Sequence, residues 1–154
     1  MRSATEVYEA LAPAVLGYFR GARVRDPEDL TGDVFANVTR GLGRFHGDDA
    51  ALRRWVFTIA HHRMVDEYRR AGRDVQVLTA EPPERAAPDP SAVIDEALTE
   101  ALARLTDDQR EVVLLRFAAD LSLKDVATIT GKRSGAVKML QTRALDELRR
   151  ILDS

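Results

Sequence analysis

The sequence has no cysteine, no long apolar run and no strong excess of charge of either sign, with a formal net charge of -2. Without cysteine there is no disulfide framework, thiolate metal site, cysteine nucleophile or thiol-based redox sensor. No window approaches the roughly 20 apolar residues of a membrane span, and the N-terminal stretch MRSATEVYEA has acids where a signal peptide needs an apolar run. We therefore expect a cytoplasmic protein without membrane insertion.

Motifs of catalysis are also missing. There is no Walker motif, no glycine-rich dinucleotide loop, no serine nucleophile elbow and no HExxH. The one cluster that resembles a metal site is His61, His62 and Asp66. His62 and Asp66 share a helix face, but His61 points elsewhere and no further ligand has a supporting spacing. We expect no enzyme, no metal and no cofactor, and keep a metal-dependent hydrolase using these residues as an alternative.

Charge is unevenly distributed along the 154 residues, a length that suits one domain or two small ones. Residues 51–75 carry six arginines against three acids, and residues 131–154 carry six basic groups against three acids. Between them, residues 76–100 carry one arginine against six acids. This pattern is compatible with two nucleic-acid contacts separated by a spacer, or with solvated helix faces.

Apolar residues recur with helical spacing almost throughout, so the sequence predicts an all-α fold. Asp26 before Pro27 predicts one helix start, and Thr106 with Gln109 predicts a capping box at another. The expected helices span about residues 5–20, 27–42, 48–70, 93–105, 106–117, 123–130 and 134–151.

One segment breaks this periodicity. Residues 73–90, RDVQVLTAEPPERAAPDP, contain four prolines and read as a flexible, proline-rich linker. The chain is therefore expected to form two small helical domains, residues 1–72 and residues 91–154.

The predicted helix at residues 48–70 has two apolar faces, whereas a helix buried once against its own core needs only one. Asp48 or Asp49 offers its N-cap. One face carries Leu52, Trp55, Val56 and Ile59, the other Phe57, Val65 and Tyr68, and a polar strip of Arg54, Thr58 and His62 runs between them. The second face suits either another helix of the same domain or a partner such as unpaired bases, on which aromatic residues stack. The short polar loop before this helix contains one aromatic residue, Phe45.

A short helix at residues 123–130 capped by Ser122, a turn at Gly131 and a longer helix capped by Ser134 form a helix-turn-helix pattern. In such motifs the second helix enters the major groove by its first turns. The entrance residues suit phosphate binding and the outward residues of the helix suit base edges. The entrance set is Lys132, Arg133 and Ser134, and the outward set is Lys138, Met139, Thr142 and Arg143.

Three segments in this order resemble the extracytoplasmic-function sigma factors, the smallest bacterial sigma factors, which direct RNA polymerase to promoters. They are DPEDLTGDVF at residues 26–35, RFHGDDAALRRWVFTIAHHRMVDEYRR at residues 44–70, and LARLTDDQREVVLLRF with LSLKDVATITGKRSGAVKMLQTRALDELRRIL in residues 102–152. The resemblance implies a non-catalytic protein that binds core RNA polymerase and promoter DNA. It also implies control by a separate anti-sigma factor.

The resemblance assigns roles residue by residue. The loop at residues 45–51 takes up a base flipped out of the element near minus ten, and the helix-turn-helix reads the element near minus thirty-five and leans on the polymerase flap. The minus-ten set is Phe45, His46, Gly47, Asp48, Arg54, Thr58 and His62; the minus-thirty-five set is Lys132, Arg133, Ser134, Lys138, Met139, Thr142 and Arg143; the polymerase-clamp set is Asp29, Leu30, Asp33 and Phe35.

The chain departs from the family pattern at three places. Gly32 replaces a polar residue, His62 replaces a frequent Asn, and Met139-Leu140-Gln141-Thr142 replaces a run with a frequent arginine. We expect an altered clamp affinity and an upstream element other than the family's commonest one. The rival function in the same broad class is a stand-alone helix-turn-helix regulator that binds duplex DNA without polymerase.

Overall fold

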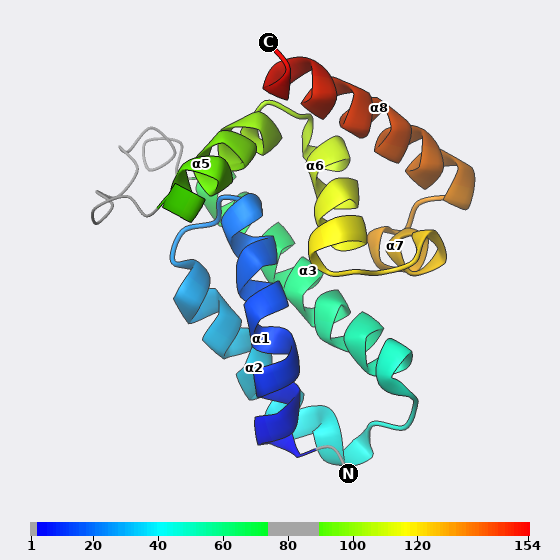
Figure 1. Cartoon of the computed structure of the whole chain (residues 1–154). Coiled ribbons are helices and arrows are strands. Elements are labelled where there is room, and N and C mark those ends of the chain that lie inside the picture. Colours follow the sequence, from blue (N-terminus) through cyan, green and yellow to red (C-terminus); the bar gives the residue numbers. More distant parts are fainter. Residues whose placement is uncertain (1–2, 74–89) are drawn as a thin grey trace.

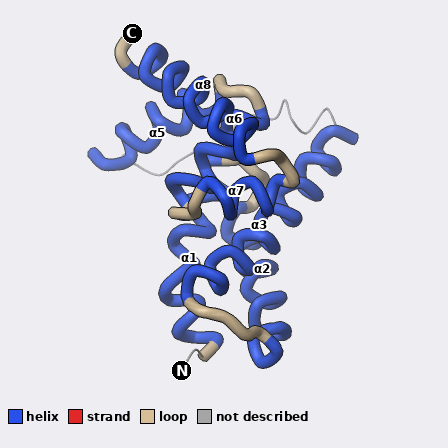
Figure 2. The backbone as a smooth tube through the Cα atoms, turned by 90° about the vertical axis from the view of Figure 1, so that its right-hand side faces the viewer, coloured by secondary structure: helices blue, strands red, loops and turns tan. Residues whose placement is uncertain are grey.

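The computed structural model describes residues 3–73 and 90–154, and all regular structure in these ranges is helical (Figures 1 and 2). The predicted all-α class is confirmed. The predicted linker, residues 73–90, lies outside the described residues except for its two ends. The elements are α1 (Ala4–Gly21), α2 (Pro27–Gly41), the 3-10 turn η1 (Leu42–Arg44), α3 (Asp49–Arg73), α5 (Pro90–Ala103), α6 (Asp107–Val113), the π-helical segment η2 (Leu114–Ala118), α7 (Leu123–Thr130) and α8 (Ser134–Leu152).

The N-terminal half, residues 3–73, is built on α1, α2 and α3. Helices α1 and α2 run side by side, and α3 packs against both (Figure 1). Apolar residues on the inner face of α1 are completely buried, among them Val15, Tyr18 and Phe19. Pro13 lies inside α1, which the periodicity alone did not flag. No helix in the described ranges is long and apolar enough to cross a membrane.

In the C-terminal half, residues 90–154, α8 packs on α5, α6 and α7. Between α6 and α7 the chain widens into the π-helical segment η2 before turning at Asp120, which has a φ of 56°. Leu115 in η2 and Val137 in α8 are fully buried at the centre of this half. The predicted helix of about residues 106–117 is therefore present, with its last turn in the π conformation.

Helix caps decide several of these boundaries. The capping box of Thr106 and Gln109 is confirmed, and Asp48 Oδ1 accepts from Ala51 N at 2.8 Å to cap α3. Two predicted caps are wrong. Asp26 adopts a left-handed conformation and makes no side-chain cap, and Ser134 is the first residue of α8 while Arg133 holds the N-cap position.

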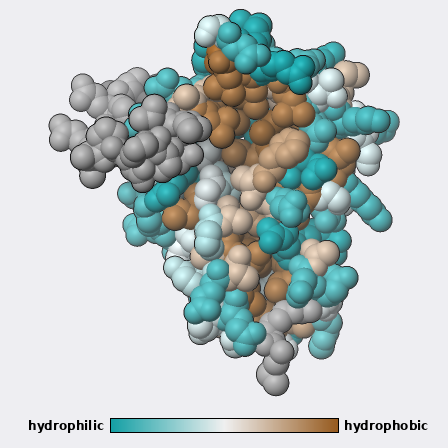
Figure 3. Space-filling view, in the orientation of Figure 1, coloured by the Kyte–Doolittle hydropathy of each residue, from teal (hydrophilic) through white to brown (hydrophobic). Residues whose placement is uncertain are grey.

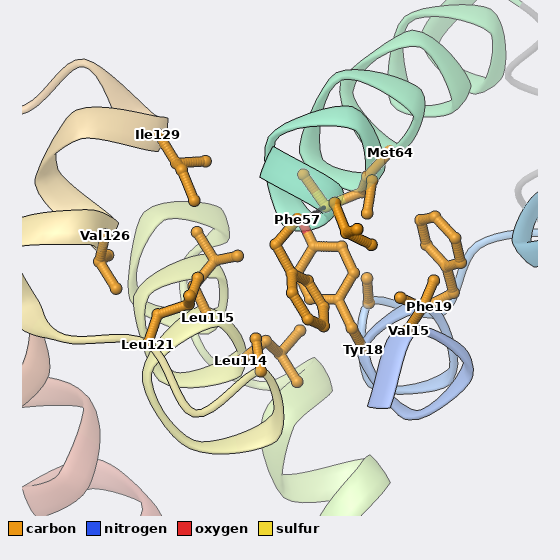
Figure 4. Close-up of a cluster of buried hydrophobic side chains, with 14 of the residues drawn as sticks. Val15, Tyr18, Phe19, Phe57, Met64, Leu114, Leu115, Leu121, Val126 and Ile129 are labelled. Atoms are coloured by element: carbon orange, nitrogen blue, oxygen red, sulfur yellow. Dashed lines mark hydrogen bonds between the residues drawn. The ribbon is translucent and has the colours of Figure 1, made fainter. Parts of the chain in front are cut away.

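The two halves pack against each other and share a continuous core. Segment η2 contacts α1, and α7 contacts α3. Figure 4 shows Phe57 and Met64 of α3 between the side chains of α1 and those of η2. Phe57 is fully buried, so the second apolar face of α3 is used within the molecule. Phe57 packs edge-on against Tyr18 of α1, as the first of the two interpretations expects, but the C-terminal half also covers α3, which neither interpretation included.

Candidate nucleic-acid interface

The loop between η1 and α3 holds Phe45 in a fixed place. Its backbone is extended, and its ring stacks nearly parallel on Trp55 of α3, with 5.2 Å between the ring centroids and 16° between the planes. A β-carbon at Gly41 would lie 2.8 Å from Cζ2 of Trp55, so the tryptophan needs glycine at this position. Phe45 is half-buried on this platform.

The next residues of the loop owe their shape to Gly47. Its φ of 154° lies in the region that favours glycine, and a β-carbon there would come within 3.1 Å of Cζ of Phe45. Gly47 thus permits the loop to fold back over the Phe45 ring. His46 is exposed, and the Asp48 carboxylate is engaged as the cap of α3.

The polar strip of α3 is only partly free. His62 is exposed, whereas the Thr58 hydroxyl donates to the carbonyl of Arg54 at 2.7 Å. The Arg54 guanidinium reaches across to α7, where Nη1 lies 3.3 Å from Oδ1 of Asp125. One member of the predicted minus-ten set is therefore paired with the helix-turn-helix.

The helix-turn-helix has the predicted geometry. The Ser122 hydroxyl caps α7 by accepting from Asp125 N at 3.1 Å, and Gly131 ends α7 with a φ of 70°. Residues Lys132 and Arg133 then lead into α8. The positive φ explains why glycine occupies the turn.

The outward residues of α8 lie where the sequence placed them. Lys138, Met139, Thr142 and Arg143 are all exposed, as are Arg133 and Ser134 at the entrance. Met139 is 54% exposed, which is unusual for a methionine and leaves its side chain available for contact. Lys132 differs because its ammonium is paired with Asp108 of α6 at 3.3 Å.

Sequence reasoning did not single out a polar groove beside this surface. It lies between the start of α6 and α8, and three of its residues, Arg143, Glu147 and Arg150, recur at helical spacing along α8. That spacing is the signal that would have found it. The groove is lined by Arg104, Thr106, Gln109, Arg143, Asp146, Glu147 and Arg150.

The residues expected to contact polymerase divide into two pairs. Asp29 and Asp33 are exposed one helical turn apart on α2, and both are free to meet a partner face. Leu30 and Phe35 are 6% exposed and belong to the core. Phe35 also packs edge-on against Tyr8, at 5.1 Å between centroids.

A buried polar cluster joins α1, α3 and α6. The Tyr18 hydroxyl donates to Glu111 Oε1 at 2.6 Å, and His61 Nδ1 lies 2.7 Å from the same oxygen. Burial, followed by the charge of Glu111, holds the pKa of Tyr18 well above its usual value, so this phenol stays a donor. Because His61 turns toward Glu111, it does not join His62 and Asp66 as a ligand. The described residues contain no group of three or more His, Asp or Glu arranged to hold a metal.

Two known family models match most of the chain. Residues 7–74 match the model of sigma-70 region 2, and residues 101–150 match that of sigma-70 region 4. The chain is 32% identical to the ECF RNA polymerase sigma factor SigD of Mycobacterium tuberculosis, over 94% of this chain and 74% of SigD. It is 33% identical to the ECF sigma factor BldN of Streptomyces coelicolor over 88% of this chain, and spans only 54% of BldN.

A solved structure has the same arrangement of helices. It is the sigma factor RpoE of Bartonella quintana in complex with the anti-sigma factor NepR. The TM-score is 0.79 at 26% identity, and the alignment covers 97% of this chain and 96% of that one.

Proposed function

The chain belongs to the extracytoplasmic-function sigma factors of bacterial RNA polymerase, and we propose that its surfaces serve promoter-specific initiation as follows. The observation that carries the proposal is the pairing, in one chain, of a glycine-shaped aromatic loop before α3 with a helix-turn-helix at α7 and α8. One surface suits an extruded base and the other suits a duplex groove. The chemistry of RNA synthesis belongs to the polymerase.

Phe45 is the residue we assign to the base flipped out near minus ten. One face of its ring rests on Trp55, so the ring is already oriented before DNA arrives. Extruding a base costs a few kcal/mol, and stacking on an aromatic ring returns about 1–3 kcal/mol. A preorganised ring returns more of that energy than a mobile one, because less conformational entropy is lost on binding. Exposed His46 is the next residue of the loop, and exposed His62 lies farther along α3.

The first turns of α8 are assigned to the major groove of the element near minus thirty-five. Arg133 and Ser134 stand at its entrance for phosphate contacts, and Lys138, Met139 and Thr142 face outward for base edges. Met139 has no hydrogen-bond donor for guanine, so we expect apolar contact, such as with a thymine methyl, at its position. Lys132 contributes to phosphate binding only after leaving Asp108.

We assign two surfaces of this chain to the contact with core polymerase. Asp29 and Asp33 offer a pair of carboxylates on α2 to the clamp, while Leu30 and Phe35 shape the helix from within. The flap contact is assigned to the apolar surface around α5, α6 and α8, seen in brown in the upper part of Figure 3. Leu98 of α5 and Leu145 and Leu152 of α8 are among the exposed large apolar residues.

Regulation is assigned to a separate anti-sigma factor. The support is the likeness to RpoE of Bartonella quintana, whose solved structure is a complex with the anti-sigma factor NepR. Such a partner would compete with polymerase for the same exposed surfaces.

Run-off transcription from a genomic fragment library tests the function. The purified chain with core polymerase is expected to yield discrete transcripts that neither component yields alone. The contrasting function, a stand-alone regulator, predicts tight and specific duplex binding by the chain without polymerase. A sigma factor divides its DNA affinity between two tethered units. We therefore expect the purified chain to bind promoter duplex only weakly when polymerase is absent. Specific duplex binding with no effect on transcript choice would reject the proposal.

A further inference from the structure

Met139 is an exposed methionine on the face of α8 that we assign to the major groove. Its side chain is 54% exposed, whereas Met64, in the core of the N-terminal half, is 4% exposed. Long side chains of a helix lean back over the preceding turn, and here that turn carries only Gly135 and Ala136. A β-carbon at Gly135 would meet nothing within 4 Å, so the space over this turn is open. The sulfur of Met139 is therefore accessible to small molecules in solution.

An accessible thioether sulfur reacts with peroxides. A lone pair of the sulfur attacks one oxygen of hydrogen peroxide, an S–O bond forms and the O–O bond breaks. The other oxygen takes up the released proton and leaves as water. The sulfur is oxidised by two electrons to the sulfoxide, and the peroxide is reduced by the same two electrons. Methionine sulfoxide reductases reverse this change, so the oxidation of such a residue is not permanent.

Oxidation changes what Met139 offers to a base edge. The thioether is apolar and suits the methyl group of thymine, whereas a sulfoxide oxygen accepts hydrogen bonds and suits the amino groups of adenine or cytosine. The exposed residues beside it on the same face include two cations, Lys138 and Arg143, which favour a negatively polarised oxygen. The contact at this position thus changes from apolar to polar, while the helix that carries it stays in place.

We propose that Met139 is a site of reversible oxidation by peroxides, and that its oxidation changes the base preference of the chain in the element near minus thirty-five. This inference rests on the proposed function, because it assigns a form of regulation to the same DNA-reading surface. The chain contains no cysteine, so a sulfur-based response within it depends on methionine. Met139 also belongs to the run that replaces a frequent arginine of the family, and an arginine offers donors but no sulfur.

The test oxidises the purified chain alone with hydrogen peroxide and removes the peroxide with catalase before core polymerase is added, so that the polymerase is never oxidised. Peptide mass spectrometry follows each methionine, and we expect Met139 to react about tenfold or more faster than Met64 because it is exposed. Run-off transcription from templates with a randomised upstream element then gives the base preference. We expect oxidation to change the preference at one base position by about fivefold or more, away from thymine.

Two variants and a repair step control the experiment. Met139→Leu keeps an apolar side chain of similar volume without sulfur, so peroxide should leave its preference as it was before treatment, although Met64 is still present. Met139→Gln carries a polar acceptor without any peroxide, so it should shift the preference in the direction that oxidation does. A methionine sulfoxide reductase with dithiothreitol should restore the original preference of the oxidised wild-type sample.

The outcomes separate this inference from the proposed function. The inference is overturned if the base preference stays within about twofold after Met139 is fully oxidised, or if Met139→Leu responds to peroxide as the wild type does. It is also overturned if Met64 reacts as fast as Met139. In each of these cases the sigma function stands, because the untreated chain still transcribes. If the untreated wild-type chain with core polymerase gives no transcripts, the proposed function is rejected and this inference with it.

Discussion

Replacing Phe45 by alanine removes the ring that we assign to the flipped base, while leaving the helices intact. The ring stacks on Trp55 with 5.2 Å between the ring centroids, and the residue is only half-buried, so its loss leaves no enclosed core cavity. Base stacking on an aromatic side chain is worth about 1–3 kcal/mol, which corresponds to a loss of about 5- to 150-fold in strand opening. We expect the affinity for core polymerase to stay unchanged.

The assay is the fluorescence of 2-aminopurine placed at the position that flips, on promoter DNA with core polymerase added. Phe117→Ala is the control, because Phe117 is a 51% exposed phenylalanine in the C-terminal half. Trp55→Leu should give an intermediate loss of up to about tenfold, since an aromatic pair adds about 0.5–1.5 kcal/mol. Strand opening by Phe45→Ala within twofold of wild type, at equal polymerase affinity, would refute the assignment of this ring.

Other variants test the fold and the duplex contact. Leu115→Ala, in the core of the C-terminal half, should lower the free energy of unfolding by about 2–5 kcal/mol in urea titrations, and a loss under 1 kcal/mol would contradict its tight packing. Ser122→Ala should cost about 1 kcal/mol because its hydroxyl caps α7, whereas Ser134→Ala should cost little; equal costs would contradict the assigned caps. Lys132→Ala should reduce the salt slope of holoenzyme binding to promoter duplex by about 1, and Asp108→Asn, which frees Lys132, should strengthen that binding; the reverse order would exclude Lys132 from phosphate contact.

Short-range sequence signals predicted the helices and most of the residues at which they begin and end. The capping box at Thr106, the cap at Ser122 and the left-handed Gly131 follow from side chains that bond within a few residues of themselves. The same rules failed at Asp26, whose backbone turns left-handed as the chain passes from α1 to α2. They also failed at Ser134, where the turn after Gly131 places the helix start one residue earlier in register.

The sequence pattern could not predict which residues far apart in the chain contact each other. Glu111 reads as one more charged residue of an amphipathic helix, and nothing near it in the chain predicts that its partners are Tyr18 and His61. The same limit applies to Leu30 and Phe35, which the resemblance placed among polymerase contacts and which lie in the core. Family motifs mix residues that touch a partner with residues that shape the helix, and burial separates the two.

The π-helical segment η2 constrains how the length of this chain can vary. A π turn accommodates one residue more than an α turn, so deleting a single residue from Leu114–Ala118 would let the backbone relax to an α-helix. Each α-helical residue turns the side chains by about 100°. Such a deletion would turn every later residue relative to α6, including buried Leu121 and the start of α7. Insertions and deletions should therefore be tolerated poorly in these five residues, even though they lie next to a surface turn at Asp120.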